Sequence, residues 1–250
     1  MDKTNRVKQI LMGMRTVLKD KPLTVKMRVG IDDGKPLVGR LLPALTAARI
    51  DALAIHGRTR QQRYTKVADW SYISQVVEMA RPHNLPIIGN GDMLSFEDYE
   101  LRKTETNVDS IMVARGALIK PWIFTEIKER RHWDISSSER LEMLKSYVRY
   151  GLEHFGSDTA GVERTRRFLL EWLSFLCRYV PVGILEQLPP KLNDRPPAYF
   201  GRDDLETLMA SPSVTDWIKL SEMLLGPVPE GFVFLPKHKS NSYENPVSQG

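Results

Sequence analysis

The segment LTVKMRV at residues 23–29 is the first of four short apolar segments that decide the fold of this chain. The others are DALAIHG at 51–57, LPIIGNG at 85–91 and DSIMVARG at 109–116. Segments of this length that are rich in branched apolar side chains are typical of buried strands. The sequence between them has the spacing of amphipathic helices. Strands that alternate with helices in this way predict parallel βαβ units.

The polar residues of these strands favour a barrel over a doubly wound sheet, although both folds contain parallel βαβ units. Alternate residues of a strand share a face. In each segment one face is apolar, while the other becomes polar only at the carboxyl end of the strand, which is where (β/α)₈ barrels place their catalytic and binding groups. Four strands are half of a barrel. The expected fold class is therefore α/β followed by all-α, with the C-terminal half of a TIM (β/α)₈ barrel preceding a helical domain.

The chain is expected to contain two domains and a tail. Residues 1–133 are interpreted as the half barrel. Beyond them the pattern is helical throughout, beginning at Ser136 and Glu139, which have the spacing of a capping box. Residues 134–235 are therefore predicted to form a helical domain. Residues 236–250 are polar, show no periodicity and are predicted to be a disordered tail.

The composition favours a protein with an anionic partner and no membrane span. The 250 residues carry a formal net charge of +5, and the pI is near 9.2. The longest apolar stretch, 168–177, is much shorter than the ~20 residues that a span requires. The single cysteine, Cys177, lies in an apolar helical pattern, so we interpret it as an inert core residue. It fits a reducing compartment, and a cytoplasmic or nuclear location is expected. No Cys/His spacing predicts a metal site.

The strand ends carry residues that suit a charged or polar ligand. Taken singly, Lys26 is better explained as a lysine that reaches solvent, and His56 as a core or loop histidine. Their shared position at the strand ends favours contact with a polar ligand instead. The sequence IIGNGD offers glycines that let a ligand approach the backbone, although a tight turn would also explain them. In ARGALIKPW, Gly116 follows a strand and begins a helix beside Arg115, which resembles the phosphate site of barrel enzymes.

Taken in order, four motifs resemble the second half of the barrel of tRNA-dihydrouridine synthases. They are LTVKMRVG, IHGRTRQQRYTKVADW, IIGNGD and MVARGALIKPWIF. The similarity continues through HWDISSSERLEMLKSYVRYGLEHFG and RRFLLEWLSFLCRYVPVGILEQLP, which resemble the eukaryotic branch that acts on uridine 47 in the variable loop. It covers roughly residues 1–240.

The resemblance implies an FMN enzyme in which NADPH reduces the flavin, the flavin passes a hydride to C6 of a flipped uracil, and a cysteine protonates C5. Arg28 and Arg58 match positions near the uridine pocket. Cys177 does not match the family's acid, which belongs to the half of the barrel that this sequence lacks, so no catalytic residue is assigned here and the chain alone is expected to be inactive. The implied cofactor-binding residues are Lys26, His56, Asn90, Gly91, Asp92, Ala114 and Arg115, to which the phosphate-site pattern adds Gly116.

Basic residues of the helical region are expected to bind tRNA, mainly through its backbone. They are Arg164, Arg166 and Arg167, at the start of a central helix predicted over residues 161–180, and Arg178 near its end. A solvated surface with scattered ion pairs is the alternative explanation.

The sequence therefore predicts FMN-dependent, NADPH-using reduction of uridine to 5,6-dihydrouridine in tRNA, in a truncated chain that lacks the catalytic cysteine. Two alternatives remain open. One is a non-catalytic tRNA-binding remnant. The other is a different FMN- or phosphate-binding barrel oxidoreductase that acts on a small molecule, against which the basic helical region argues.

Overall fold

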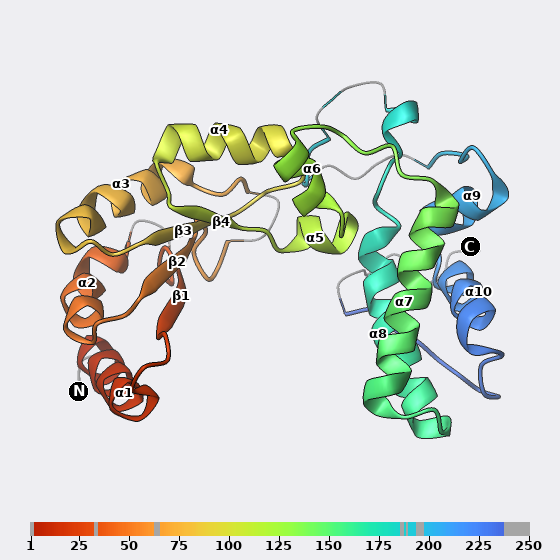
Figure 1. Ribbon diagram of the computed structural model, residues 1–250, viewed down its shortest axis with the longest axis horizontal. Coiled ribbons are helices and arrows are strands. Elements are labelled where there is room, and N and C mark those ends of the chain that lie inside the picture. The colour runs from red at the N-terminus through yellow and green to blue at the C-terminus, as the bar shows by residue number, and fades with distance from the viewer. Residues whose placement is uncertain are drawn as a thin grey trace, which may run out of the picture. The chain divides into compact units, whose positions relative to one another are not determined.

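The computed structural model describes residues 3–32, 35–62, 66–185, 188, 190–193 and 198–237. The chain divides into two compact units, here called the sheet unit and the helical unit (Figure 1). The sheet unit contains residues 1–117, 123–131 and 189–193, and the helical unit contains residues 118–122, 132–188 and 194–250. The division is less simple than the single boundary predicted after residue 133, because each unit includes a short segment from beyond that boundary. The predicted tail lies outside the described residues from 238 onward.

The sheet unit is built on four parallel strands in the order β1-β2-β3-β4. The register places Arg28 opposite His56, His56 opposite Asn90, and Asn90 opposite Met112, so the carboxyl ends of the strands lie together. Within the described part of the chain, β1 and β4 are the edges of an open sheet. The strands are β1 (Thr24–Arg28), β2 (Ala52–His56), β3 (Ile87–Asn90) and β4 (Ser110–Met112).

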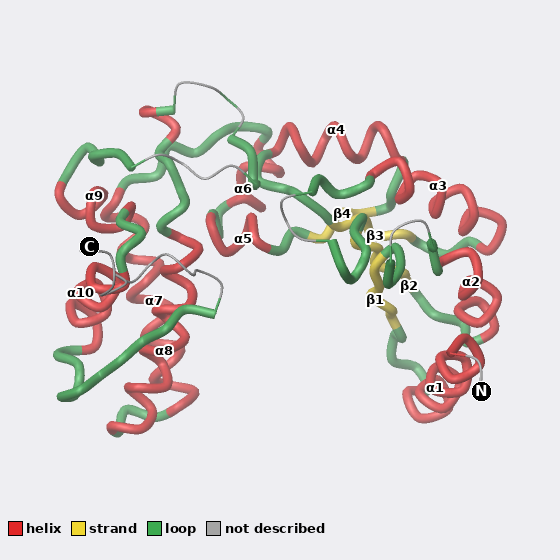
Figure 2. The backbone as a smooth tube through the Cα atoms, turned by 180° about the vertical axis from the view of Figure 1, so that it is seen from behind, coloured by secondary structure: helices red, strands yellow, loops and turns green. Residues whose placement is uncertain are grey.

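Helices α1 to α4 lie along one side of this sheet (Figure 2). The apolar strand face that the sequence predicted, including Leu53, Ile55 and Ile87, packs with Trp70 and Ile73 of α3 in a single buried core. The elements of this unit are α1 (Lys3–Leu18), α2 (Val38–Ala47), α3 (Trp70–Ala80), η1 (Arg81–His83), α4 (Phe96–Thr106), α6 (Ile123–Glu129) and the start of α5 (Arg115–Ile119).

Side-chain caps fix where two of these helices begin. The Asp69 carboxylate accepts a hydrogen bond from the backbone N–H of Tyr72 at 2.9 Å. Ser95 and Asp98 form a reciprocal capping box, in which each side chain accepts from the other residue's backbone N–H. The loops that precede these helices follow β2 and β3, so the caps also fix the chain beside the carboxyl ends of those strands.

The helical unit is formed by α7 (Ser137–Phe155), α8 (Thr159–Leu176), η2 (Val182–Ile184), α9 (Asp204–Ala210) and α10 (Val214–Leu225). Its core contains Leu144, Leu169, Leu173 and Trp217, all of which are at most 1% exposed. The predicted capping box of Ser136 and Glu139 is present. No helix among the described residues is long and apolar enough to cross a membrane. Parallel strands followed by helices confirm the predicted fold class.

Candidate functional site

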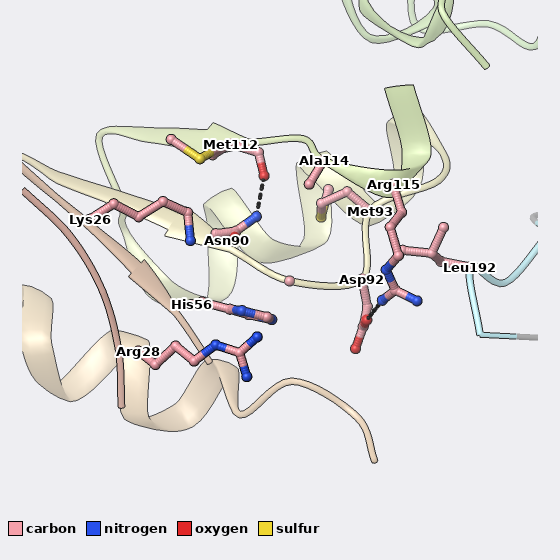
Figure 3. Close-up of a pocket in the computed structure, with 11 residues that line it drawn as sticks. Lys26, Arg28, His56, Asn90, Asp92, Met93, Met112, Ala114, Arg115 and Leu192 are labelled. Atoms are coloured by element: carbon pink, nitrogen blue, oxygen red, sulfur yellow. Dashed lines mark hydrogen bonds and ion pairs between the residues drawn. The ribbon is translucent and has the colours of Figure 1, made fainter. Parts of the chain in front are cut away.

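The carboxyl ends of the strands border a pocket of about 200 Å³ in the sheet unit (Figure 3). Residues of the predicted polar strand face come together here with the loops that follow β3 and β4. The pocket is lined by Lys26, Arg28, His56, Asn90, Gly91, Asp92, Met93, Met112, Ala114, Arg115 and Leu192. Seven of the eight predicted cofactor-binding residues are in this set; Gly116 is not.

Packing explains both predicted glycines of the site without a ligand. A Cβ on Gly116 would lie 2.0 Å from the carbonyl oxygen of Met93, and a Cβ on Gly91 would lie 2.4 Å from the Cβ of Ala68. Gly91 also has a φ of +151°, which side-chain-bearing residues rarely adopt. The glycines therefore allow close contact between segments of the chain at this rim of the pocket.

Asp92 is the carboxylate of the pocket, and it is held by two arginines. One oxygen, Oδ2, accepts from Arg58 Nη2 at 2.7 Å and from the backbone N–H of Ala68 at 2.8 Å, while Oδ1 accepts from Arg115 Nη2 at 2.9 Å. Arg115 also donates to Asn193 Oδ1 at 3.2 Å. Because these arginines neutralise Asp92, the pocket retains an excess of positive charge.

Lys26 and Arg28 form the cationic end of the pocket and lie beside the ring of His56 (Figure 3). Partial burial, and then the charge of Arg28, lowers the pKa of Lys26. Burial also lowers the pKa of His56 to about 4, assisted by the charges of Arg28, Lys26 and Arg58 and opposed by Asp92. His56 is therefore neutral at physiological pH. Arg58 Nη1 lies 3.3 Å from His56 Nε2, and a guanidinium only donates, so Nε2 is the acceptor and the ring proton lies on Nδ1.

We expect His56 to stay neutral in the folded protein down to about pH 5, with its proton on Nδ1. Its folded pKa is about 4 and the unfolded reference value is 6.5, so the unfolded chain binds more protons between those values. The contribution of His56 to stability must therefore fall as the pH falls through this window.

Long-range ¹H–¹⁵N NMR spectra of the His56 ring would check the tautomer. Unfolding of wild type and His56→Asn between pH 4 and 7 would check the linkage. An imidazolium signal at pH 6, or equal pH slopes for both proteins, would contradict this account.

Arg58 was predicted to lie near the uridine, but its side chain is buried and so cannot contact RNA directly. It is 0% exposed. In addition to Asp92 and His56, its guanidinium donates to the backbone carbonyl of Lys66, which Nε reaches at 2.9 Å. Arg58 thus positions the ring of His56 and the loop after β2. Arg28 differs, because it lines the pocket while donating through Nη1 to the carbonyl of Thr59 at 2.7 Å. Its role toward uridine stays a prediction.

The arginines predicted to bind RNA have different environments in the helical unit. Arg164 and Arg167 are exposed on α8, and Arg178 beyond its end is half-buried. Arg166 is 0% exposed, so its prediction as an RNA contact is wrong. Its guanidinium donates to Glu163 Oε1 and Ser221 Oγ, each at 3.0 Å, and to the carbonyl oxygens of residues 225, 226 and 227.

The helical periodicity of the sequence contained the signal for this difference. Arg166 is three and seven residues before Leu169 and Leu173, and therefore shares their buried face. The only cysteine in the sequence, Cys177, is 5% exposed in the helical-unit core, so its interpretation as a core residue is confirmed. Among the described residues, no cluster of histidine, cysteine and carboxylate side chains could hold a metal ion.

Comparison with known proteins shows which family this chain resembles. The family model described as "Dihydrouridine synthase (Dus)" matches residues 1–175. The chain belongs to the dihydrouridine synthase family. It is 63% identical over 244 residues to a rat protein named tRNA-dihydrouridine(47) synthase [NAD(P)(+)]-like, and 62% identical to the human protein of the same name. A tRNA-dihydrouridine(47) synthase [NAD(P)(+)] of the fungus Coprinopsis cinerea is 53% identical over 258 residues.

These alignments use nearly all of this chain but a smaller part of its relatives. They cover 98% of this chain for the two mammalian proteins and 100% for the fungal protein. The same alignments cover 38% of the rat and fungal proteins and 37% of the human protein. The chain therefore spans less than two fifths of the length of these family members.

Proposed function

We propose that this chain serves an FMN-dependent enzyme that reduces uridine to 5,6-dihydrouridine in the variable loop of tRNA, with NADPH as the reductant. The observation that carries the proposal is the convergence of Lys26, Arg28, His56 and Arg115 on one pocket at the strand ends of a dihydrouridine synthase sequence. Such an excess of cationic and donor groups suits a ligand that combines a phosphate with an electron-rich ring.

The pocket fits part of FMN. Ligand pockets usually measure about 300–1,000 Å³, whereas this one measures about 200 Å³. Lys26, His56 and Asn90 would hold the ring, and Arg115 would hold the phosphate. Helix α5 has only five residues, so the charge of Arg115 is the main attraction for a phosphate there. When bound, reduced FMN supplies a hydride to C6 of the uracil.

The residues of the chain would prepare this chemistry through charge and hydrogen bonding. The ammonium of Lys26 would stabilise negative charge on an electron-rich ring edge. Arg58 donates to Nε2 of His56, so the ring proton lies on Nδ1. Nδ1–H of His56 is therefore available as a donor to a ligand. Asn90 Nδ2 donates to the carbonyl of Met112 at 2.8 Å, which fixes the amide between β3 and β4. Each group is thus oriented by the sheet or by a neighbouring side chain before a ligand binds.

Protonation of C5 needs an acid that these 250 residues do not supply from a cysteine, because Cys177 is buried in the core of the helical unit. We therefore expect no dihydrouridine when the chain is incubated with FMN, NADPH and unmodified tRNA. Mass spectrometry of the digested tRNA would measure the product. A full-length relative in the same assay is the positive control. Product at a comparable rate would show that another residue here acts as the acid.

A second candidate function is a non-catalytic tRNA-binding protein, which the exposed Arg164 and Arg167 of the helical unit would serve. The two functions differ in their need for flavin. Binding of tRNA without any measurable binding of FMN would favour the second.

A further inference from the structure

A group of aromatic and arginine side chains, most of them exposed, lies on the helical hairpin of α7 and α8. It consists of Phe155, Arg164, Arg167 and Phe168 and is here called the aromatic–arginine surface. Figures 1 and 2 show α7 and α8 side by side, joined by a short connection. Residues 164, 167 and 168 are three and four positions apart on α8, so they share one face of the helix.

The two phenylalanines form a stacked pair that remains accessible. The ring centroids of Phe155 and Phe168 are 5.7 Å apart, and their planes differ by 13°. Phe168 is 50% exposed. The rings of His154 and Phe155 also form a T-shaped contact, with a centroid distance of 4.6 Å. An exposed phenylalanine that is already stacked offers an apolar π surface at little further cost in conformational entropy.

The two arginines are held against aromatic rings and not against carboxylates. The guanidinium carbon of Arg164 lies 5.6 Å from the centroid of Phe155, and that of Arg167 lies 5.3 Å from the centroid of Phe232. Neither arginine forms an ion pair within the part of the chain that the structure describes.

The nearby acids have other partners. Glu163 pairs with Arg166 at 3.0 Å, Glu153 with Arg149 at 3.9 Å, and Asp158 caps α8 by accepting from the N–H of Gly161. Positive charge therefore remains beside the exposed ring. This combination fits a partner that presents anionic groups and flat rings together, which single-stranded RNA does.

We propose that Phe168 is a stacking platform for an unpaired base of tRNA, and that Arg164 and Arg167 bind the phosphates beside that base. This inference rests on the proposed function in taking tRNA as the partner. It adds base stacking to backbone attraction, and so predicts that the helical unit prefers unpaired segments to continuous duplex. An acidic protein would use the arginines but would gain little from the stacked rings.

The test measures binding of the 250-residue protein to an unmodified tRNA transcript and to a fully paired RNA duplex of equal length, from about 50 to 200 mM salt. Phe168→Leu keeps an apolar side chain but removes the π face. We expect it to weaken tRNA binding roughly tenfold, within the range seen for loss of one stacked base, and to leave duplex binding and the salt slope unchanged. Phe168→Trp should retain wild-type affinity, which excludes a merely structural effect. Phe200→Leu is the matched control, because Phe200 is 90% exposed in the same unit.

Arg164→Gln/Arg167→Gln tests the phosphate contacts separately. Loss of two contacts should weaken binding to both RNAs and reduce the salt slope by roughly 1.4–1.8, at about 0.7–0.9 per contact. Three results would overturn the stacking inference while leaving tRNA as a partner. Phe168→Leu could bind tRNA with wild-type affinity, or it could lose equal affinity for tRNA and duplex. Alternatively, Phe168→Trp could bind tRNA more weakly than the wild type. No tRNA binding by the wild type, or binding of polyglutamate as tight as that of tRNA, would overturn both the inference and the proposed partner.

Discussion

Arg166→Met is expected to lower the free energy of unfolding of the helical unit by roughly 3 kcal/mol or more, the range found when one member of a buried ion pair is removed. The methionine would approximate the length of the side chain but could not donate. Ser221 and the carbonyls of residues 225, 226 and 227 would lose a buried donor that joins α8 to the end of α10. Such acceptors cost free energy when they are left without a partner in the interior.

Arg167→Met is the matched control, because Arg167 is adjacent in sequence but exposed on the same helix. Substitutions at exposed positions usually change stability by no more than about 0.5 kcal/mol. Urea denaturation followed by tryptophan fluorescence would measure both variants, since Trp172 and Trp217 lie in or against the core of the helical unit. Similar small losses of stability for the two variants would contradict a structural role for Arg166.

The strands and most of the helices could be predicted because the side-chain patterns that indicate them lie within short stretches of sequence. Alternation of side chains along the strands separated the core face from the pocket face, and the structure places Leu53 in the core and Lys26 in the pocket. The spacing of Ser136 and Glu139 indicated the start of a helix. The short helices α6 and α9 were not predicted, since seven residues are too few to establish a helical period.

The partners of the buried arginines could not be predicted, because they are distant in sequence. Arg58 reaches Asp92, 34 residues away, and Arg166 reaches carbonyls 59 to 61 residues away. Read as isolated charges, both suit a nucleic-acid surface. Only the tertiary fold shows that they stabilise the chain. The need for glycine at position 116 could not be predicted either, because it depends on a close approach to the Met93 backbone.

Lys26→Met is expected to weaken FMN binding at least tenfold with little change in stability. Within the described residues, Lys26 forms no hydrogen bond and no ion pair with a carboxylate, so its removal leaves no partner unsatisfied. Hydrogen bonds that involve a charged group are typically worth about 1.5–3 kcal/mol, which corresponds to roughly 10- to 150-fold in affinity. Lys8→Met is the matched control, because Lys8 is an exposed lysine of α1 that does not line the pocket.

Wild-type FMN binding itself is expected to be saturable but weaker than micromolar, since the pocket of about 200 Å³ encloses only part of such a ligand. Arg115 can form charge-assisted hydrogen bonds with a phosphate, so loss of the phosphate should weaken binding. Riboflavin, which lacks the phosphate, should therefore bind more weakly than FMN.

Fluorescence titration of FMN into the wild type, Lys26→Met and Lys8→Met tests most directly whether the cationic pocket is a flavin site. We expect saturable binding that Lys26→Met weakens at least tenfold and Lys8→Met leaves unchanged. An absence of saturable binding to the folded wild-type protein, or equal affinities for all three proteins, would contradict it.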